Sequence, residues 1–400
     1  MEAGLAAGPA PAPGGPAGDW RHGGFGLYVH WPFCLAKCPY CDFNSHVSRA
    51  IDQPAWRAGL LAELAHARAM SGPRPLDTVF FGGGTPSLMP PETVGAVIEA
   101  ADAAWGLVPG AEITLEANPT SVEAAKFRAY AAAGVNRVSI GVQALDDASL
   151  KALGRTHSVA EAEAAFAVAR EAFARVSFDL IYARMGQSVA DWERELARAL
   201  AMAVDHLSLY QLTIEAGTRF ADLHRLGKLR VPEDGTAAEM YALTQSMTGA
   251  AGLPAYEISN HARPGAESRH NRLYWRYGDY AGIGPGAHGR LSLATGQRLA
   301  TETLRDPAVW LAAVKAGGHA LTVTEPVAPA DQAVEMMLMG LRLVEGIDPA
   351  RYRALAGQSL PADRVAALIG DGALERAGPR LRATPRGRMV LNSVLATLLA

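Results

Sequence analysis

The chain has 400 residues, of which 49% are hydrophobic, and a formal net charge of −3. This apolar content suffices for a large core, and the small net charge gives no electrostatic footprint for nucleic acid or an anionic membrane. No segment has about eighteen uninterrupted apolar residues, which excludes a membrane-spanning helix. Three cysteines without a disulfide pattern indicate a reducing compartment, so we expect a cytoplasmic protein.

The chain begins with a low-complexity segment. Residues 1–19 are mostly Ala, Pro and Gly and carry almost no charge. They have neither the basic start nor the apolar run of a signal peptide, so we expect a disordered tail.

Short apolar runs then alternate with Ala-rich amphipathic stretches as far as about residue 212. The runs are typical of buried strands and cover residues 26–30, 78–81, 112–116, 137–142, 176–182 and 206–212. Helical periodicity separates them, for example at residues 56–70, 92–105, 122–133 and 160–173. This alternation predicts an α/β fold with a parallel sheet covered by helices. Its six units indicate an open, partial (β/α)6 TIM-like barrel.

The pattern becomes irregular after residue 213, and we expect the core domain to extend over residues 20–300. The last part, residues 301–400, is rich in Ala, Leu and Arg. It includes a predicted helix over 332–343 and a predicted β-hairpin near 381–389. We expect a mostly helical, winged-helix-like appendage there.

All three cysteines lie in one loop, as Cys34, Cys38 and Cys41, directly after the first predicted strand. Three thiolates at this spacing can reach three corners of an iron–sulfur cluster and leave one iron open to a small molecule. A structural zinc site needs four ligands, and His30 or His46 could supply the fourth. The odd count and tight spacing argue against a disulfide framework, and structural cysteines would be scattered through the core. We favour the cluster.

The segment 28–43, with its CxxxCxxC spacing, resembles the radical S-adenosylmethionine (SAM) superfamily. Its flanks resemble the branch of the oxygen-independent coproporphyrinogen III dehydrogenases and the related haem chaperone HemW. The resemblance implies that the three thiolates hold a [4Fe–4S] cluster whose free iron is chelated by SAM. Reduction by an electron donor then splits SAM into methionine and a 5′-deoxyadenosyl radical. The resemblance extends over about residues 26–289.

A Gly-Gly-Gly-Thr-Pro segment follows the second predicted strand and includes Gly83, Gly84 and Thr85. Residues without a Cβ let the backbone approach a ligand closely, although a tight turn would also explain them. No Lys-Ser/Thr pair follows, so a phosphate-binding P-loop is not supported. The resemblance implies that this segment holds the amino group of SAM.

Glu116 ends an apolar strand, where an unpaired charge is costly, although it could also cap the next helix. The resemblance implies that it contacts SAM, together with Gln143, Arg155 and Asp179. It also implies that Tyr28 and Tyr40 line the adenosyl pocket, although aromatic residues at strand ends often only pack. Nearly all of these residues follow or end predicted strands, which is the end where barrels of this kind place their chemistry.

Four histidines lie in distinctive blocks: His30, His261, His270 and His288. Each is most simply explained as a hydrogen-bonding residue, yet His is a common axial ligand of haem iron. His270 begins a His-Asn-Arg-Leu-Tyr-Trp block beside Tyr274 and Trp275, which could stack on a macrocycle. We therefore select His270 as the candidate haem ligand.

Phe43 stands where the decarboxylating members of the family have a fourth cysteine. Few residues precede Cys34, whereas those enzymes place a long segment over the site. Both features favour a haem chaperone that binds a cluster, SAM and haem and delivers haem to membrane haemoproteins. The alternatives are the coproporphyrinogen III dehydrogenase, an enzyme of porphyrin biosynthesis, and a zinc-stabilised interaction module. The segment 183–187, Ala-Arg-Met-Gly-Gln, also departs from the family's usual Gly-Leu-Pro-Gly-Gln.

Overall fold

The computed structural model describes residues 18–48 and 50–400. The predicted N-terminal tail therefore lies outside the described residues, apart from its last two. Asp19 differs from the prediction, because it begins the 3₁₀ helix η1 (Asp19–His22) and accepts hydrogen bonds from Arg351 at 2.8 Å. Within the described ranges, none of the helices combines the length and apolar character that crossing a membrane requires.

The centre of the molecule is one sheet whose order is β13-β12-β11-β10-β1-β4-β5-β6-β7-β8-β9. Its middle strands are the six predicted ones, all parallel to one another: β1 (Phe25–Trp31), β4 (Leu76–Gly83), β5 (Leu107–Ala117), β6 (Arg137–Gln143), β7 (Arg175–Tyr182) and β8 (His206–Gln211). The strands curve into a barrel wall whose two edges, β13 and β9, do not pair with each other. The predicted open α/β barrel is confirmed.

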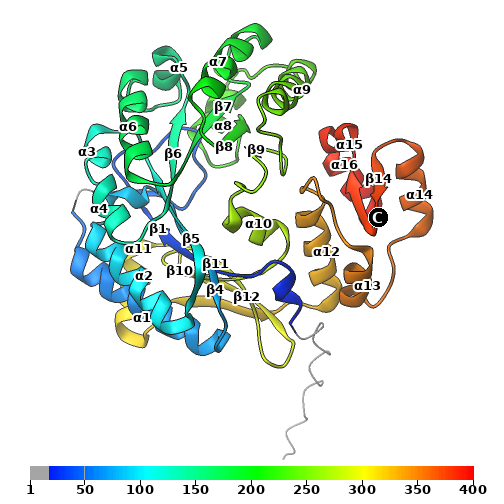
Figure 1. The fold of residues 1–400 in the computed structure, drawn as a ribbon. Helices are drawn as coiled ribbons and strands as arrows, with labels where there is room; N and C mark the ends of the chain where they lie inside the picture. Colours follow the sequence, from blue (N-terminus) through cyan, green and yellow to red (C-terminus); the bar gives the residue numbers. More distant parts are fainter. Residues whose placement is uncertain (1–17, 49) are drawn as a thin grey trace, which may run out of the picture.

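Helices cover the outer face of this sheet (Figure 1). The helices of this part of the chain are α1 (Gln53–Ser71), η2 (Pro86–Leu88), α2 (Pro91–Trp105), α3 (Ser121–Ala124), α4 (Phe127–Ala132), α5 (Asp147–Ala152), α6 (Val159–Ala172), α7 (Val189–Met202), α8 (Arg219–Arg225) and α9 (Asp234–Ala250). Of these, η2 follows the glycine-rich segment, and α8 contacts the cysteine loop, where the Phe220 N–H donates to the Pro39 carbonyl at 2.9 Å. Ser158 and Glu161 form a capping box that fixes the start of α6. The helix predicted over 122–133 is wrong in one respect, since the chain breaks it into α3 and α4.

The irregular region after residue 213 extends the sheet. Its elements are β9 (Asn260–Ala262), α10 (Arg269–Trp275), β10 (Asp279–Ile283), β11 (His288–Ser292), β12 (Arg298–Thr303), α11 (Pro307–Gly317) and β13 (Leu321–Pro326). Strand β10 runs parallel to β1, and β11 to β13 follow it antiparallel. The ring of Trp310 in α11 stacks on Trp56 at 5.0 Å inside the barrel core. We therefore propose that the core domain ends after Pro326 rather than at residue 300, which falls inside β12.

The remaining residues form a lobe with its own apolar core, beside α10 (Figure 1). It consists of α12 (Pro329–Gly340), α13 (Pro349–Ala356), α14 (Ala362–Gly370), β14 (Leu374–Ala377), β15 (Arg380–Ala383), α15 (Pro385–Met389) and α16 (Leu391–Leu399). The predicted helical appendage with a hairpin is thus present. The hairpin lies earlier than 381–389, because Pro385 begins a helix whose N-cap is Thr384.

Short strands also close the cysteine loop. β2 (Phe33–Cys34) pairs in parallel with β3 (His46–Val47), which brings the two ends of the loop together. The loop therefore projects from the carboxyl end of β1 as a closed unit.

Candidate functional site

The three cysteines line one cavity of about 140 Å³ at the carboxyl ends of the barrel strands. All three are free thiols, and Cys34 is buried while Cys38 and Cys41 are partly exposed. Inside the loop, the backbone N–H of Cys41 donates to the carbonyl of Cys38 at 3.2 Å. Burial raises the pKa of the Cys34 and Cys41 thiols. A positive centre is thus needed to keep these sulfurs as thiolates.

The glycine-rich segment at the end of β4 is bound to the cysteine loop. The Gly84 N–H donates to the Trp31 carbonyl at 2.7 Å, and the Thr85 N–H donates to the Phe33 carbonyl at 2.9 Å. The Thr85 hydroxyl donates to Cys34 Sγ at 3.4 Å. A Cβ on Gly84 would lie 2.8 Å from the Phe33 carbonyl oxygen, so the close approach of the two backbones requires glycine there.

Two carboxylates, Glu116 at the end of β5 and Asp179 in β7, line the same cavity. Burial and the nearby Asp179 raise the pKa of Glu116 to about 8, and burial raises that of Asp179 to about 6. The Ser139 hydroxyl donates to Asp179 Oδ1 at 3.3 Å. Two acids with raised pKa values in one cavity are suited to binding a cationic ligand.

Arg155 lies between the carboxylates and the cysteines. Its guanidinium donates to Cys38 Sγ at 3.3 Å, to Asn118 Oδ1 at 2.5 Å and to the Gly141 carbonyl at 2.9 Å. Its Nε is buried without a hydrogen-bond partner among the described residues. Gln143 lines the same cavity with a φ of 72°, which is unfavourable for any residue that has a Cβ. Strain of this kind is concentrated at functional sites.

A second cavity of about 410 Å³ adjoins the first, since both are lined by Phe43, Gly83 and Glu116. Its wall is aromatic: Tyr28 stacks on Phe80 with ring centroids 6.3 Å apart. Tyr274 and Tyr280, from α10 and β10, complete this wall.

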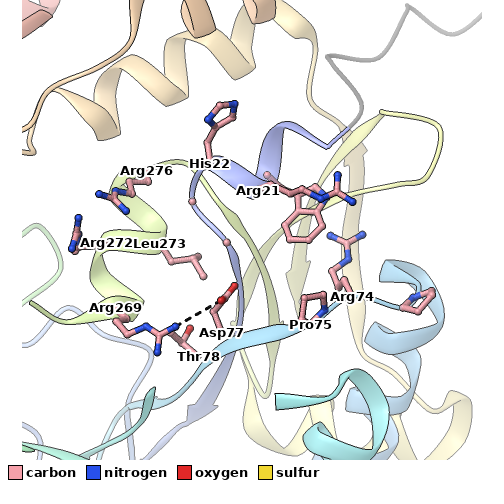
Figure 2. A pocket seen from close by; sticks show the side chains of 14 residues that line it. Arg21, His22, Arg74, Pro75, Asp77, Thr78, Arg269, Arg272, Leu273 and Arg276 are labelled. Atoms are coloured by element: carbon pink, nitrogen blue, oxygen red, sulfur yellow. Dashed lines mark ion pairs between the residues drawn. The ribbon is translucent and has the colours of Figure 1, made fainter. Parts of the chain in front are cut away.

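A third cavity, of about 480 Å³, lies at the opposite end of the barrel, before the amino ends of β1 and β4 (Figure 2). Arg269, Arg272 and Arg276 extend from one face of α10, and Arg21 and Arg74 lie across from them. Arg269 lies 3.8 Å from Asp77 (dashed in Figure 2). Arg276 forms two hydrogen bonds with Glu345, at 2.8 and 2.7 Å. Arg74 forms an ion pair with Asp279 at 2.7 Å. Neighbouring carboxylates therefore neutralise much of this arginine cluster.

Comparison with known proteins shows the family to which the chain belongs. Residues 28–199 match the Radical SAM superfamily, and residues 327–390 match the HemN C-terminal domain, which begins directly after β13. The chain is 38% identical over 400 residues to heme chaperone HemW of Mycobacterium tuberculosis, covering 98% of this chain and 96% of that protein. It is 35% identical over 378 residues to heme chaperone HemW of Escherichia coli, covering 94% and 98%. The chain belongs to the HemW family of radical SAM proteins.

Two further similarities agree with this placement. The mitochondrial radical S-adenosyl methionine domain-containing protein 1 of Bos taurus is 41% identical over 385 residues, covering 94% of this chain and 87% of that protein. The structure of coproporphyrinogen III oxidase (HemN) from Escherichia coli superposes with a TM-score of 0.76 at 22% identity, covering 94% of this chain and 90% of that one. This last similarity concerns the fold.

The residues of the first cavity fit the cluster and SAM that the superfamily name implies. Three thiols, the buried unpartnered Nε of Arg155 and a cradle in which Gly84 leaves no room for a Cβ surround one space. No three His, Cys, Asp or Glu side chains in residues 18–48 and 50–400 converge on a point that could hold a single metal ion. The thiols instead surround a space, which suits a multi-iron cluster better than one ion.

The structure brings together in this cavity most of the residues that the sequence predicts for it: Cys34, Cys38, Cys41, Tyr40, Gly83, Gly84, Thr85, Glu116, Gln143, Arg155 and Asp179. Tyr28 instead lines the second cavity, where its hydroxyl hydrogen-bonds His30 Nδ1 at 3.0 Å. Tyr28 lies in the middle of β1, next to β10, whose Tyr280 lines the same second cavity.

His270 lines neither cavity and is only 1% exposed. Its Nδ1 hydrogen-bonds the Thr78 hydroxyl at 2.7 Å, its Nε2 hydrogen-bonds the Tyr274 hydroxyl at 3.0 Å, and its ring stacks on Phe80 at 4.8 Å. Burial and Arg137 lower its pKa to about 3. With both ring nitrogens engaged, His270 holds the aromatic wall in place and does not offer a ligand to iron.

Sequence reasoning missed Asn118 and Ser139, which line the first cavity. Asn118 accepts from Arg155 and donates from Nδ2 to the Thr85 hydroxyl at 3.1 Å. Strand alternation offered a signal for Ser139, since it shares one face of β6 with Gly141 and Gln143. Asn118 lies in the loop just beyond β5, where the sequence has neither helical nor strand periodicity to reveal it.

The segment that departs from the family pattern keeps an ordered turn. Ala183 has a φ of 55° and Gly186 one of 73°. Arg184 binds Glu195 at 2.6 Å, and Gln187 binds the same carboxylate at 3.0 Å. The ion pair with α7 fixes the turn in which the family's proline is missing.

Proposed function

We propose that this protein is a haem chaperone that holds a [4Fe–4S] cluster and SAM, binds haem and delivers it to membrane haemoproteins. The observation that carries the proposal is the near full-length similarity to proteins named heme chaperone HemW. The cysteine cavity supports the cluster, and its paired carboxylates support a cationic ligand such as SAM.

In this proposal each group of residues has one task. Cys34, Cys38 and Cys41 ligate three irons of the cluster. Gly83, Gly84 and Thr85 would hold the amino group of SAM, since their backbone adjoins the cysteine loop. A bound, reduced cluster supplies the electron that can cleave SAM.

The carboxylates and Arg155 complete the SAM site. Glu116 and Asp179 balance the positive sulfonium and ammonium groups. Arg155 pairs with the carboxylate of SAM through its Nε, which has no partner among the described residues. Tyr40 packs beside the nucleoside of SAM, and its ring centroid lies 6.1 Å from that of Phe220. Gln143 offers an amide to the same ligand.

Phe43 argues against the alternative, a coproporphyrinogen III dehydrogenase. It occupies the position of the fourth cysteine, is 57% exposed and lines both adjoining cavities. A radical reaction needs a site closed to water, whereas reversible docking of a flat macrocycle needs an open one. We infer a cytoplasmic protein that receives electrons from a reductant and passes haem to a membrane-bound acceptor.

One experiment tests the proposal. The protein is reconstituted anaerobically with iron and sulfide, and parallel samples are titrated with haem and assayed for conversion of coproporphyrinogen III. We expect about four irons per chain, saturable haem binding and no decarboxylated product. Robust decarboxylation with SAM and reductant would establish the enzyme instead.

A further inference from the structure

The second cavity has the shape and chemistry to receive haem. Five aromatic side chains line it: Tyr28, Phe43, Phe80, Tyr274 and Tyr280. Tyr28 and Phe80 lie opposite each other on the paired strands β1 and β4, with their ring planes tilted by only 24°. Phe43, 57% exposed, comes from the cysteine loop. A cavity lined by aromatic side chains suits a planar apolar ring system.

Of the three histidines around this wall, two have both ring nitrogens engaged. His270 is bonded by Thr78 and Tyr274, and His30 is bonded by Tyr28 at 3.0 Å and by the Asn44 carbonyl at 2.9 Å. His288 differs, because its side chain is 60% exposed. Within residues 18–48 and 50–400 its ring makes no hydrogen bond, and the nearest carboxylate oxygen, on Glu302, lies 3.9 Å from Nε2. His288 can therefore offer a nitrogen lone pair to iron.

The rim also provides a cation. Arg305 lines the cavity beside His288 and forms no ion pair within the part of the chain that the structure describes. Its backbone carbonyl accepts from Asn44 Nδ2 at 2.9 Å, and the same amide donates to the Pro285 carbonyl at 2.9 Å. Asn44 thus fixes the cysteine loop, Arg305 and the segment before His288 relative to one another. A haem carries two propionates, for which an arginine on the rim is a suitable partner.

We propose that haem docks in this aromatic cavity with His288 as its axial ligand and Arg305 pairing a propionate. The inference rests on the proposed function and names the site within it. Neutral His288 donates one lone pair to the iron, and no electron or proton is exchanged. His270 is a positioning residue here, since it supports Phe80 and Tyr274 from behind the wall.

The test compares four variants of the full-length protein in hemin titrations followed by absorption and electron paramagnetic resonance spectroscopy. His288→Ala should lose the nitrogen-ligated haem spectrum, and added imidazole should restore it. His270→Ala should weaken binding but keep that spectrum. Arg305→Gln should weaken binding roughly tenfold with the spectrum unchanged. His22→Ala, an exposed histidine of the arginine-lined cavity, is the matched control and should change nothing.

The outcomes separate the inference from the function. If the unaltered protein binds no haem, the proposed function fails. If it binds haem and His288→Ala retains the original spectrum, the function stands and this site is overturned. Loss of nitrogen ligation in His270→Ala or His22→Ala, with His288→Ala unaffected, would also overturn it. Normal cluster content in each variant confirms folding.

Discussion

Both ends of the barrel are rich in charged side chains, but these side chains differ in how completely they are paired. At the amino end, Asp279 is fully buried and accepts from Arg74 at 2.7 Å and from Arg298 at 2.8 Å. Glu345 forms ion pairs with Arg276 at 2.7 Å and with Arg380 at 3.3 Å. These cations are matched by carboxylates that come from other segments, including the C-terminal lobe.

At the carboxyl end, charged side chains lack complete pairing among the described residues. Burial raises the pKa of both Glu116 and Asp179, Asp179 raises that of Glu116 further, and Arg155 keeps a buried nitrogen without a partner among the described residues. Unmatched groups of this kind cost stability unless a ligand completes them. A barrel commonly keeps stability at its amino end and chemistry at its carboxyl end. The arginine-lined cavity is therefore the structural one here.

The strongest test of this comparison removes a cysteine. Replacement of Cys38 by Ala should abolish cluster assembly completely, because Cys34 and Cys41 are the only other thiols in the chain and no fourth cysteine can take its place. Iron and sulfide analysis and the sulfur-to-iron absorption after anaerobic reconstitution measure the effect. Ser45→Ala, which lies beside Cys41 at 3.9 Å, is the control and should keep its cluster. A Cys38 variant with a full iron content would refute the ligand assignment.

The amino end should respond in stability alone. Asp279→Asn leaves Arg74 and Arg298 buried without their carboxylate, which we expect to cost about 3–5 kcal/mol. Thermal unfolding measures the loss, and SAM affinity of the folded protein should not change. Arg269→Ala is the contrast: its side chain is 42% exposed and 3.8 Å from Asp77, so the cost should stay below about 1 kcal/mol. Reduced SAM affinity in either variant would contradict the division.

SAM binding should depend on Glu116 and on pH. The pKa of Glu116 in the free site is about 8, so at lower pH the carboxyl is protonated and must lose its proton to the solvent when a cationic ligand binds. Affinity should then rise with pH, by up to about tenfold per unit, and level off above that pKa. Glu116→Gln should bind roughly ten- to a hundredfold more weakly and lose this slope.

Calorimetry in two buffers with different ionisation enthalpies counts the protons. Release of close to one proton per SAM at neutral pH is expected for the unaltered protein and almost none for Glu116→Gln. Equal proton release by both would show that another group, such as Asp179, carries the linkage. Asp146→Asn is a control, because that carboxylate lies outside the cavity and is half exposed.

Much of the active end follows from the sequence because it depends on local order. The six strands alternate with helices, and in a parallel sheet their carboxyl ends must meet at one edge. That geometry alone brings Cys34, Gly83, Glu116, Gln143 and Asp179 together. Asp179 and Ser139 share the inward face of neighbouring strands for the same reason.

The parts that sequence reasoning did not find depend on contacts between distant segments. Strand β10 pairs with β1 from far along the chain, and no periodicity in residues 213–300 predicts it. The burial of His270 depends on Thr78 and Phe80 of β4, so its aromatic neighbours in sequence gave a misleading signal. The end of the core domain that we propose, after Pro326, depends on sheet pairing as well, because β13 joins the sheet through β12.

The smallest expected effect concerns the turn that departs from the family pattern. Ala183 is held at a φ of 55°, which costs an L-residue roughly 1–2 kcal/mol. Glycine removes that strain but loses about 0.5–1 kcal/mol through the greater freedom of the unfolded chain. Ala183→Gly should therefore stabilise the protein by about 0.5–1 kcal/mol in denaturant unfolding, with SAM affinity unchanged.

The matched control is Ala197→Gly, an exposed position inside α7 with ordinary helical geometry, which should destabilise by about 1 kcal/mol. The two changes delete the same methyl group, so opposite signs isolate the backbone conformation as the cause. Destabilisation by both would mean that the contacts of the buried Ala183 methyl group, which is 2% exposed as a residue, outweigh the strain at this φ.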